Sequence, residues 1–137
     1  MDYYLNKNTS LMRLKEEYQK YGKLIFAVDF DDTILGYNSQ RINEKIASLL
    51  KRWKPYAEII IWSCRREDEY DFILRTCAEA GFIPDKINES SSIVDFGTRK
   101  IYANVILDDR AGLKQVYNDL YTLIGWIEEG DVKYNGN

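Results

Sequence analysis

The stretch that decides the fold is Leu24-Ile25-Phe26-Ala27-Val28-Asp29-Phe30-Asp31-Asp32-Thr33, a short apolar run that ends in three carboxylates and a threonine. An apolar run of this length, rich in Ile, Val and Phe, predicts a strand that is buried on both faces. The carboxylates that follow it cannot lie in the core, because burying unpaired charges is very costly. In an open α/β sheet, ligands bind at the carboxyl ends of the strands. We therefore predict a strand over 24–29 that leads directly into a functional site.

The carboxylates themselves indicate the chemistry of that site. Three carboxylates within four residues repel one another unless a cation or bound protons offset their charge. Mg²⁺ takes hard oxygen ligands of this kind and shares its remaining shell with water and substrate phosphate. Side chains alternate along an extended chain, so Asp29 and Asp31 point to one side, where one carboxylate could attack phosphorus and the other could move a proton. The alternative is an acidic loop in which Asp32 and Thr33 cap the following helix.

Strands and helices alternate along the rest of the chain. Apolar spacing and helix-ending residues predict helices over about 9–22, 40–53, 67–80 and 112–122 or further, and strands over 24–29, 58–62, 82–87 and 103–107. Such alternation predicts an α/β fold with a doubly wound, Rossmann-like parallel sheet flanked by helices. A chain of 137 residues fits one domain over 1–137, with a core over about 22–125 and a polar tail over about 130–137.

Composition excludes several classes of function. The chain is 45% apolar and 30% charged, which is typical of a globular protein, and it has no apolar stretch long enough to span a membrane. The two cysteines show no metal-like spacing and the first residues do not resemble a signal peptide, so we expect a cytoplasmic protein. The absence of histidine excludes Ser-His-Asp and Cys-His catalysis within this chain. A formal charge of −3 argues against broad electrostatic binding of nucleic acid.

Polar residues also follow two other predicted strands. Ser63 comes after the strand over 58–62, and Asp108 and Asp109 come after the strand over 103–107. Since the carboxyl ends of parallel strands share one edge of the sheet, we expect these residues to converge with the acidic run at 29–33. Lys100, eight residues before Asp108, could bring a cation over the carboxylates.

This constellation resembles the haloacid dehalogenase-like hydrolase superfamily over residues 24 to about 117. The run Asp29-Phe30-Asp31-Asp32-Thr33 matches its first motif, Ser63 its second, Lys100 its third and Asp108-Asp109 its acidic fourth motif. The sequence around Lys100 and Asp108 looks especially like the small capless members, which include phage-type hydrolases and the deoxyribonucleotidase branch. Neither 34–58 nor 64–99 is long enough for a folded cap domain.

The resemblance implies a role for each matching residue. Asp29 is expected to be the nucleophile that forms an aspartyl-phosphate and also binds Mg²⁺, and Asp31 the general acid–base that offers its backbone carbonyl to the metal. Ser63 is expected to hydrogen-bond the phosphoryl group and Lys100 to neutralise it, although Lys86 could also be the third-motif lysine. Asp108 and Asp109 complete the metal site.

Thr33 and Arg65 are further candidates for substrate binding. Arginines in a loop more often make surface ion pairs, so that alternative stays open for Arg65. The expected substrate is a phosphorylated small molecule, a nucleotide or a terminal phosphate of nucleic acid, which Arg65, Arg66, Arg99 and Lys100 could attract by a local positive potential.

Two other classes of function compete with a phosphatase. A response-regulator-like receiver is also a small doubly wound domain with an acidic cluster and a lysine, but it carries its phosphoacceptor Asp after the middle strand. Here the middle strand ends in Ser63. The other alternative is a catalytically silent relative that serves as a binding module.

Overall fold

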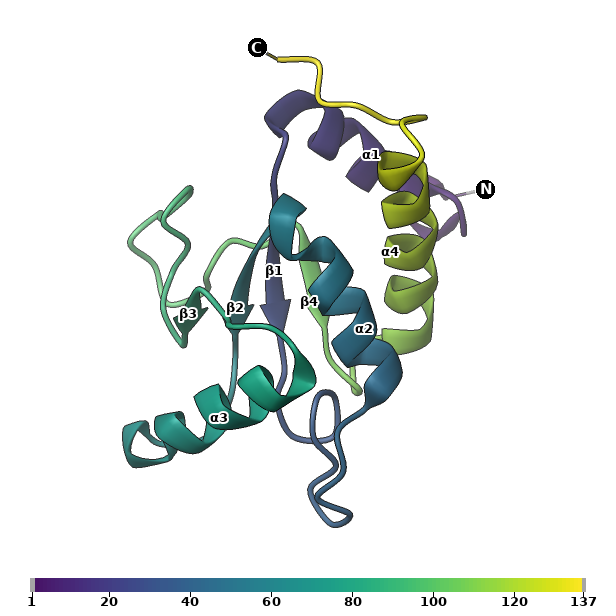
Figure 1. The fold of residues 1–137 in the computed structure, drawn as a ribbon. Helices are drawn as coiled ribbons and strands as arrows, with labels where there is room; N and C mark the ends of the chain where they lie inside the picture. The colour runs from purple at the N-terminus through teal and green to yellow at the C-terminus, as the bar shows by residue number, and fades with distance from the viewer. Residues whose placement is uncertain (1, 137) are drawn as a thin grey trace.

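The computed structural model describes residues 2–136 and shows a parallel sheet flanked by helices (Figure 1). The α-helices are α1 (Thr9–Tyr21), α2 (Glu44–Trp53), α3 (Tyr70–Ala80) and α4 (Leu113–Glu128). The strands are β1 (Leu24–Val28), β2 (Ala57–Ile61), β3 (Lys86–Ile87) and β4 (Val105–Leu107), in the spatial order β3-β2-β1-β4. Short 3₁₀ turns cover Tyr3–Leu5, Lys54–Tyr56 and Glu67–Glu69. The predicted α/β, Rossmann-like class is confirmed.

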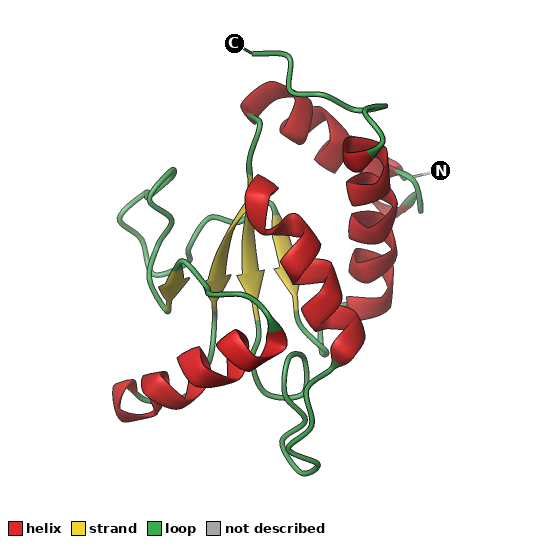
Figure 2. Ribbon diagram, in the orientation of Figure 1, coloured by secondary structure: helices red, strands yellow, loops and turns green. Residues whose placement is uncertain are grey.

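The central strand β1 organises the sheet. All five of its residues are buried, and it pairs in parallel with β2 on one side and β4 on the other. Phe26 lies opposite Ile59 and Val105 in this register, and Val28 lies opposite Ile61 and Leu107. All strands therefore end at the same edge of the sheet, where the arrowheads lie in Figure 2.

The two faces of the sheet are covered differently. Leu24, Phe26 and Val28 belong to the main apolar cluster with residues of all four α-helices, and the rings of Phe26 and Trp53 of α2 lie 5.2 Å apart. Segment 88–104, which connects β3 to β4 without a helix, contacts the opposite face at β2, while Ile106 of β4 is 51% exposed. Glu58 of β2 accepts hydrogen bonds from the backbone and hydroxyl of Ser92 in that segment.

Several elements are shorter than their apolar patterns predicted. The helix expected over 40–53 begins at Glu44, because the Asn43 side chain accepts the Ile46 N–H and caps the helix. The strand expected over 82–87 is reduced to Lys86–Ile87, because Pro84 lacks an N–H and the Asp85 side chain takes the Ile59 N–H. The strand expected over 103–107 begins only at Val105, since the Asn104 side chain accepts the Ile25 N–H at 2.7 Å.

Both ends of the described chain contribute to the buried core. Leu14 and Tyr18 of α1 are buried, as are Ile127 of α4 and Val132 beyond it, so the packed region extends outside 22–125. In the C-terminal segment the Asn135 N–H donates to the Gln19 carbonyl at 2.8 Å. This segment therefore packs on α1.

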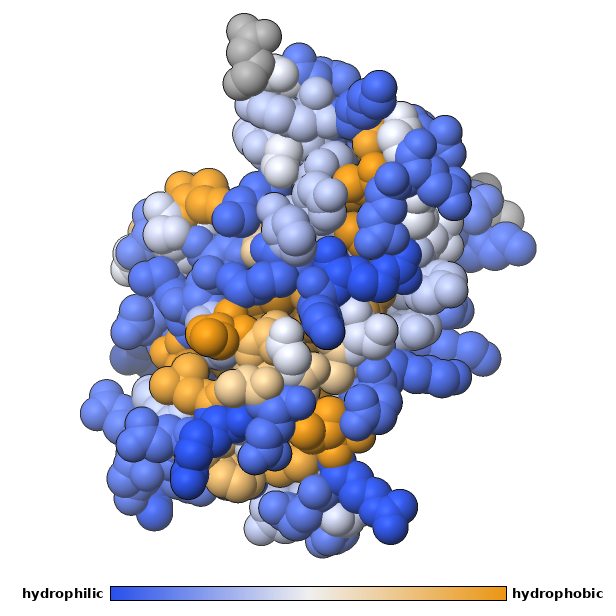
Figure 3. All heavy atoms as spheres, viewed as in Figure 1, coloured by the Kyte–Doolittle hydropathy of each residue, from blue (hydrophilic) through white to orange (hydrophobic). Residues whose placement is uncertain are grey.

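Within residues 2–136, no helix has both the length and the apolar character needed to cross a bilayer. On the side shown in Figure 3, hydrophilic residues cover the outer surfaces of the helices, and apolar residues are visible mainly in the hollow between α2 and α3.

Candidate active site

Three carboxylates converge at the carboxyl ends of β1 and β4. The Asp29 N–H donates to the Leu107 carbonyl at 2.8 Å, which continues the β1–β4 ladder by one residue and brings Asp29 beside Asp108. Each of Asp29, Asp108 and Asp109 places one oxygen within 4.8 Å of the others. The structure thus brings together the residues that the sequence placed after two separate strands.

Thr33 contacts two of the three aspartates of this cluster. Its side chain is fully buried, and its Oγ1 lies 3.3 Å from Asp29 Oδ2 and 3.4 Å from Asp109 Oδ1. The same oxygen accepts the Asp109 N–H at 3.0 Å. Substrate binding by Thr33 stays a prediction, and in this structure its hydroxyl is enclosed and contacts the two aspartates.

The negative charges of Asp29, Asp108 and Asp109 are close together and not offset by a paired cation among the described residues. Burial, the charge of Asp108 and the nearby Asp109 together raise the pKa of Asp29 to about 7, and the hydrogen bond from Thr33 only partly opposes them. Among residues 2–136, no lysine or arginine forms an ion pair with Asp29, Asp108 or Asp109. Closely spaced, unpaired carboxylate oxygens are a donor set that fits a hard divalent cation such as Mg²⁺.

The raised pKa of Asp29 predicts how the metal-free protein responds to pH. The folded pKa of about 7 exceeds the ordinary value of 3.8, so the contribution of Asp29 to stability is fully present below about pH 4 and is lost as pH rises through 7. In EDTA, the wild type should lose on the order of 1–2 kcal/mol more than Asp29→Asn between about pH 5 and pH 8, after allowance for solvent screening. Urea unfolding of both proteins at the two pH values measures the difference, and equal losses would contradict it.

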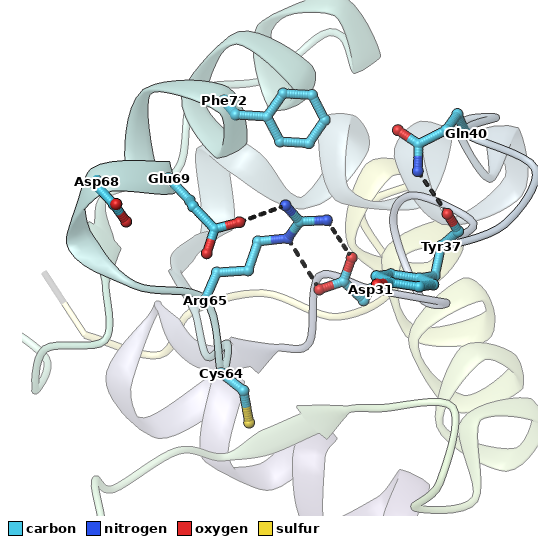
Figure 4. Close-up of a pocket in the computed structure, with 8 residues that line it drawn as sticks. All are labelled: Asp31, Tyr37, Gln40, Cys64, Arg65, Asp68, Glu69 and Phe72. Atoms are coloured by element: carbon cyan, nitrogen blue, oxygen red, sulfur yellow. Dashed lines mark hydrogen bonds and ion pairs between the residues drawn. The ribbon is translucent and has the colours of Figure 1, made fainter.

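Asp31 lies outside the metal-like cluster and is held by Arg65. The guanidinium makes two bonds to the carboxylate, at 2.8 and 3.1 Å, and a third to Glu69 at 3.0 Å (Figure 4). It also lies 5.4 Å from the Phe30 ring centroid and 5.1 Å from that of Phe72. The hydrogen bond to Asp31 is the main cause that raises the pKa of Arg65. Arg65, predicted to bind substrate or a surface partner, instead pairs with the second carboxylate of the first motif.

Asp32 has a structural role in the following turn. Its φ of 63° lies in the left-handed region, and its Oδ1 accepts the Tyr37 N–H at 2.9 Å. Asp32 is exposed and does not share the cluster of Asp29. It therefore shapes the loop that follows β1, although no helix begins there as the capping interpretation required.

Ser63 is positioned by Asn88, a residue that the sequence reasoning missed. Asn88 Oδ1 accepts the Ser63 N–H at 2.8 Å, while its Nδ2 donates to the Ser63 carbonyl and to the Tyr70 hydroxyl, both at 2.9 Å. Ser63 Oγ accepts the Arg65 N–H at 3.1 Å. Asn88 directly follows β3, so the rule that polar residues after strands form the site would also have selected it.

Lys100 is exposed and forms no ion pair with Asp29, Asp31, Asp108 or Asp109 among the described residues, so its expected role stays a prediction. The Asn104 N–H donates to the carbonyl of Ile25 at the start of β1, so the preceding residues enter the sheet at its amino edge. Lys100 precedes by four residues the contact of Asn104 with the amino edge of the sheet, whereas Asp29 follows the carboxyl end of β1. Lys86, the alternative, pairs with Glu89 at 3.5 Å. Arg65 is the only cation that forms an ion pair with a predicted site carboxylate among the described residues.

Comparison with known proteins supports the fold and gives no information on the chemistry of the site. No protein-family model matches the chain, and no curated protein matches it. A solved structure described as a conserved protein coded by a locus from Bacteroides thetaiotaomicron is similar, with a TM-score of 0.57 and 26% sequence identity. The match covers 79% of this chain and 92% of the other. It supports the α/β architecture on which the convergence of the aspartates depends.

Proposed function

We propose that this chain is a Mg²⁺-dependent phosphatase of the haloacid dehalogenase type, acting on a phosphate monoester through an aspartyl-phosphate. The observation that carries the proposal is the convergence of Asp29, Asp108 and Asp109 at one edge of the sheet, with Asp31 two residues beyond Asp29. The substrate would be a phosphorylated small molecule or a nucleotide.

Each residue has a definite task in this mechanism. A carboxylate oxygen of Asp29 attacks phosphorus as the bond to the leaving oxygen breaks, and Asp31 gives that oxygen a proton. Asp31 then takes a proton from the water that attacks phosphorus and breaks the bond to Asp29, which releases inorganic phosphate. Mg²⁺, held by Asp29, Asp108 and Asp109, would neutralise these carboxylates and the charge of the phosphoryl group.

The remaining residues hold the reacting groups in place. Arg65 positions the Asp31 side chain through two hydrogen bonds, one of which opens when that oxygen carries the proton that Asp31 transfers. Asn88 fixes the backbone of Ser63 at the same edge, where the Ser63 hydroxyl could bind a phosphoryl oxygen. Phosphoryl transfer depends chiefly on such positioning and on charge neutralisation.

Hydrolysis of p-nitrophenyl phosphate tests the proposal. We expect continuous turnover with Mg²⁺, loss of turnover in EDTA, and recovery when Mg²⁺ is restored. Asp32→Asn is the matched control, since it removes a neighbouring carboxylate that shapes the loop, and it should keep activity within about threefold. A receiver would accumulate a stable phosphoprotein without turnover, and a binding module would release no phosphate, so either result would contradict the phosphatase.

A further inference from the structure

An open cavity lies beside Asp31, and its lining includes none of Asp29, Asp108 and Asp109. It has a volume of about 760 Å³ and is lined by Asp31, Tyr37, Gln40, Cys64, Arg65, Asp68, Glu69 and Phe72 (Figure 4). Gln40 and Phe72 also line an adjoining hollow of about 450 Å³ between the loop after β1 and α3. Cavities of this size accommodate small organic molecules. Because Asp31 is the proposed proton donor to the leaving oxygen, the rest of the leaving group would enter this cavity.

The lining of the cavity is acidic. The two hollows together present five carboxylates and two guanidiniums. Arg65 is already bound by Asp31 and Glu69, and Arg66, which is not part of the lining, pairs with the lining residue Asp68. Arg99 and Lys100 precede the contact of Asn104 with the amino edge of the sheet. With Arg66 counted, the five carboxylates still outnumber the three guanidiniums, so the positive charge at the mouth is offset and a second negative group on the substrate would be repelled.

Hydrogen-bond acceptors dominate the polar groups of the lining. Gln40 Nε2 donates to the Tyr37 carbonyl at 2.6 Å, while its amide oxygen accepts no hydrogen bond from the described residues. The carboxylates of Asp68 and Glu69 are acceptors as well. Specific recognition here requires a ligand that supplies donors, such as an ammonium, amine or hydroxyl group.

Two aromatic rings border the same space. Tyr37 lies beside Asp31 and is 60% exposed, and Phe72 lies above Arg65 (Figure 4). One face of Phe72 is covered by the Arg65 guanidinium, at 5.1 Å from the ring centroid. Because one face of Phe72 is occupied, Tyr37 is the ring that can stack on a flat ring of the leaving group.

From these contacts we infer that the cavity selects phosphate monoesters whose leaving group carries a flat ring and is neutral or positively charged. This inference rests on the proposed phosphatase function and narrows its substrate class. It favours phosphorylated phenols, other ring-bearing alcohols and single nucleotides. It disfavours nucleic-acid ends, because the remaining phosphates of the strand would face the acidic lining.

Three aryl phosphates with similar leaving oxygens test the charge preference. They are phosphotyramine, 4-ethylphenyl phosphate and 3-(4-phosphonooxyphenyl)propanoate, which carry a positive, a neutral and a negative group at the same position. We expect kcat/KM to fall in that order, by about tenfold or more from the first to the third at low ionic strength. Asp68→Lys should reduce or invert this ratio. Glu67→Lys makes the same charge change on the neighbouring residue outside the lining and should keep the wild-type ratio.

A second pair of variants tests the ring contact. Tyr37→Ala should lower kcat/KM for 4-ethylphenyl phosphate by about tenfold, in the range of a lost aromatic contact, and Tyr37→Phe should retain it. Hydrolysis of acetyl phosphate, which has no ring, should change less than that of the aryl substrate.

The outcomes distinguish failure of this inference from failure of the proposed phosphatase function. Equal kcat/KM for the three aryl phosphates, or an unchanged ratio in Asp68→Lys, would overturn the inference while the phosphatase function stands. Failure to hydrolyse any of these esters or acetyl phosphate with Mg²⁺ would overturn both.

Discussion

Asp29→Asn should lower kcat by about 10³-fold or more with every phosphate ester that the wild type hydrolyses. An amide is a far weaker nucleophile than a carboxylate, and the change also removes one charge from the oxygens shared with Asp108 and Asp109. The measurement is steady-state phosphate release at saturating Mg²⁺, together with acid-quench detection of phosphoprotein, which should form in the wild type and not in the variant.

The variant should fold normally, so the loss can be assigned to chemistry. Replacement of Asp29 removes a charge whose burial and repulsion by Asp108 raise its pKa to about 7, and metal-free Asp29→Asn should therefore be at least as stable as the wild type above that pH. If purified, folded Asp29→Asn kept wild-type turnover, Asp29 could not be the nucleophile.

Arg65→Ala should cause the second largest loss, with kcat lower by about 10²–10³-fold, the scale seen when one group that positions or stabilises charge is removed. The substitution frees both oxygens of Asp31 and also leaves Glu69 without its partner. Because Asp31 acts during bond breaking, kcat should fall more than KM rises. Arg65→Lys should keep part of the activity, since a lysine supplies the charge but cannot bind both carboxylate oxygens in the same planar geometry.

Two other basic residues provide the comparison. Lys100→Ala should leave kcat within about twofold of the wild type, because Lys100 is exposed and forms no ion pair with a site carboxylate among the described residues. Arg66→Ala, next to Arg65 and paired on the surface with Asp68, should also have a small effect on kcat. A larger loss in Lys100→Ala than in Arg65→Ala would show that the lysine reaches the phosphoryl group in solution.

The position of the acidic site could be predicted from the sequence because it depends on local patterns. The apolar run 24–28 forms the central buried strand, and the carboxyl ends of β1 and β4 meet by the geometry of any parallel sheet. Asp29, Asp108 and Asp109 were therefore brought together by periodicity and strand direction alone. Residues that precede a strand enter the sheet at its amino edge, so strand direction also argues against Lys100 as a residue of this site.

Tertiary structure decided which side chains serve that site and how. Arg65 contacts Asp31 because the turn after β2 brings the guanidinium against the rings of Phe30 and Phe72, which are distant in sequence. Thr33 is enclosed because the turn after β1 brings its hydroxyl against Asp29. Asn88 hydrogen-bonds Ser63 from a left-handed backbone conformation with a φ of 54°. The sequence by itself determined the sheet and the convergence of the aspartates, since these follow from hydrophobic spacing and chain direction. Only the folded structure decided the partner of Asp31, the burial of Thr33 and the acidic cavity beside them, because these depend on the directions of side chains from separate loops.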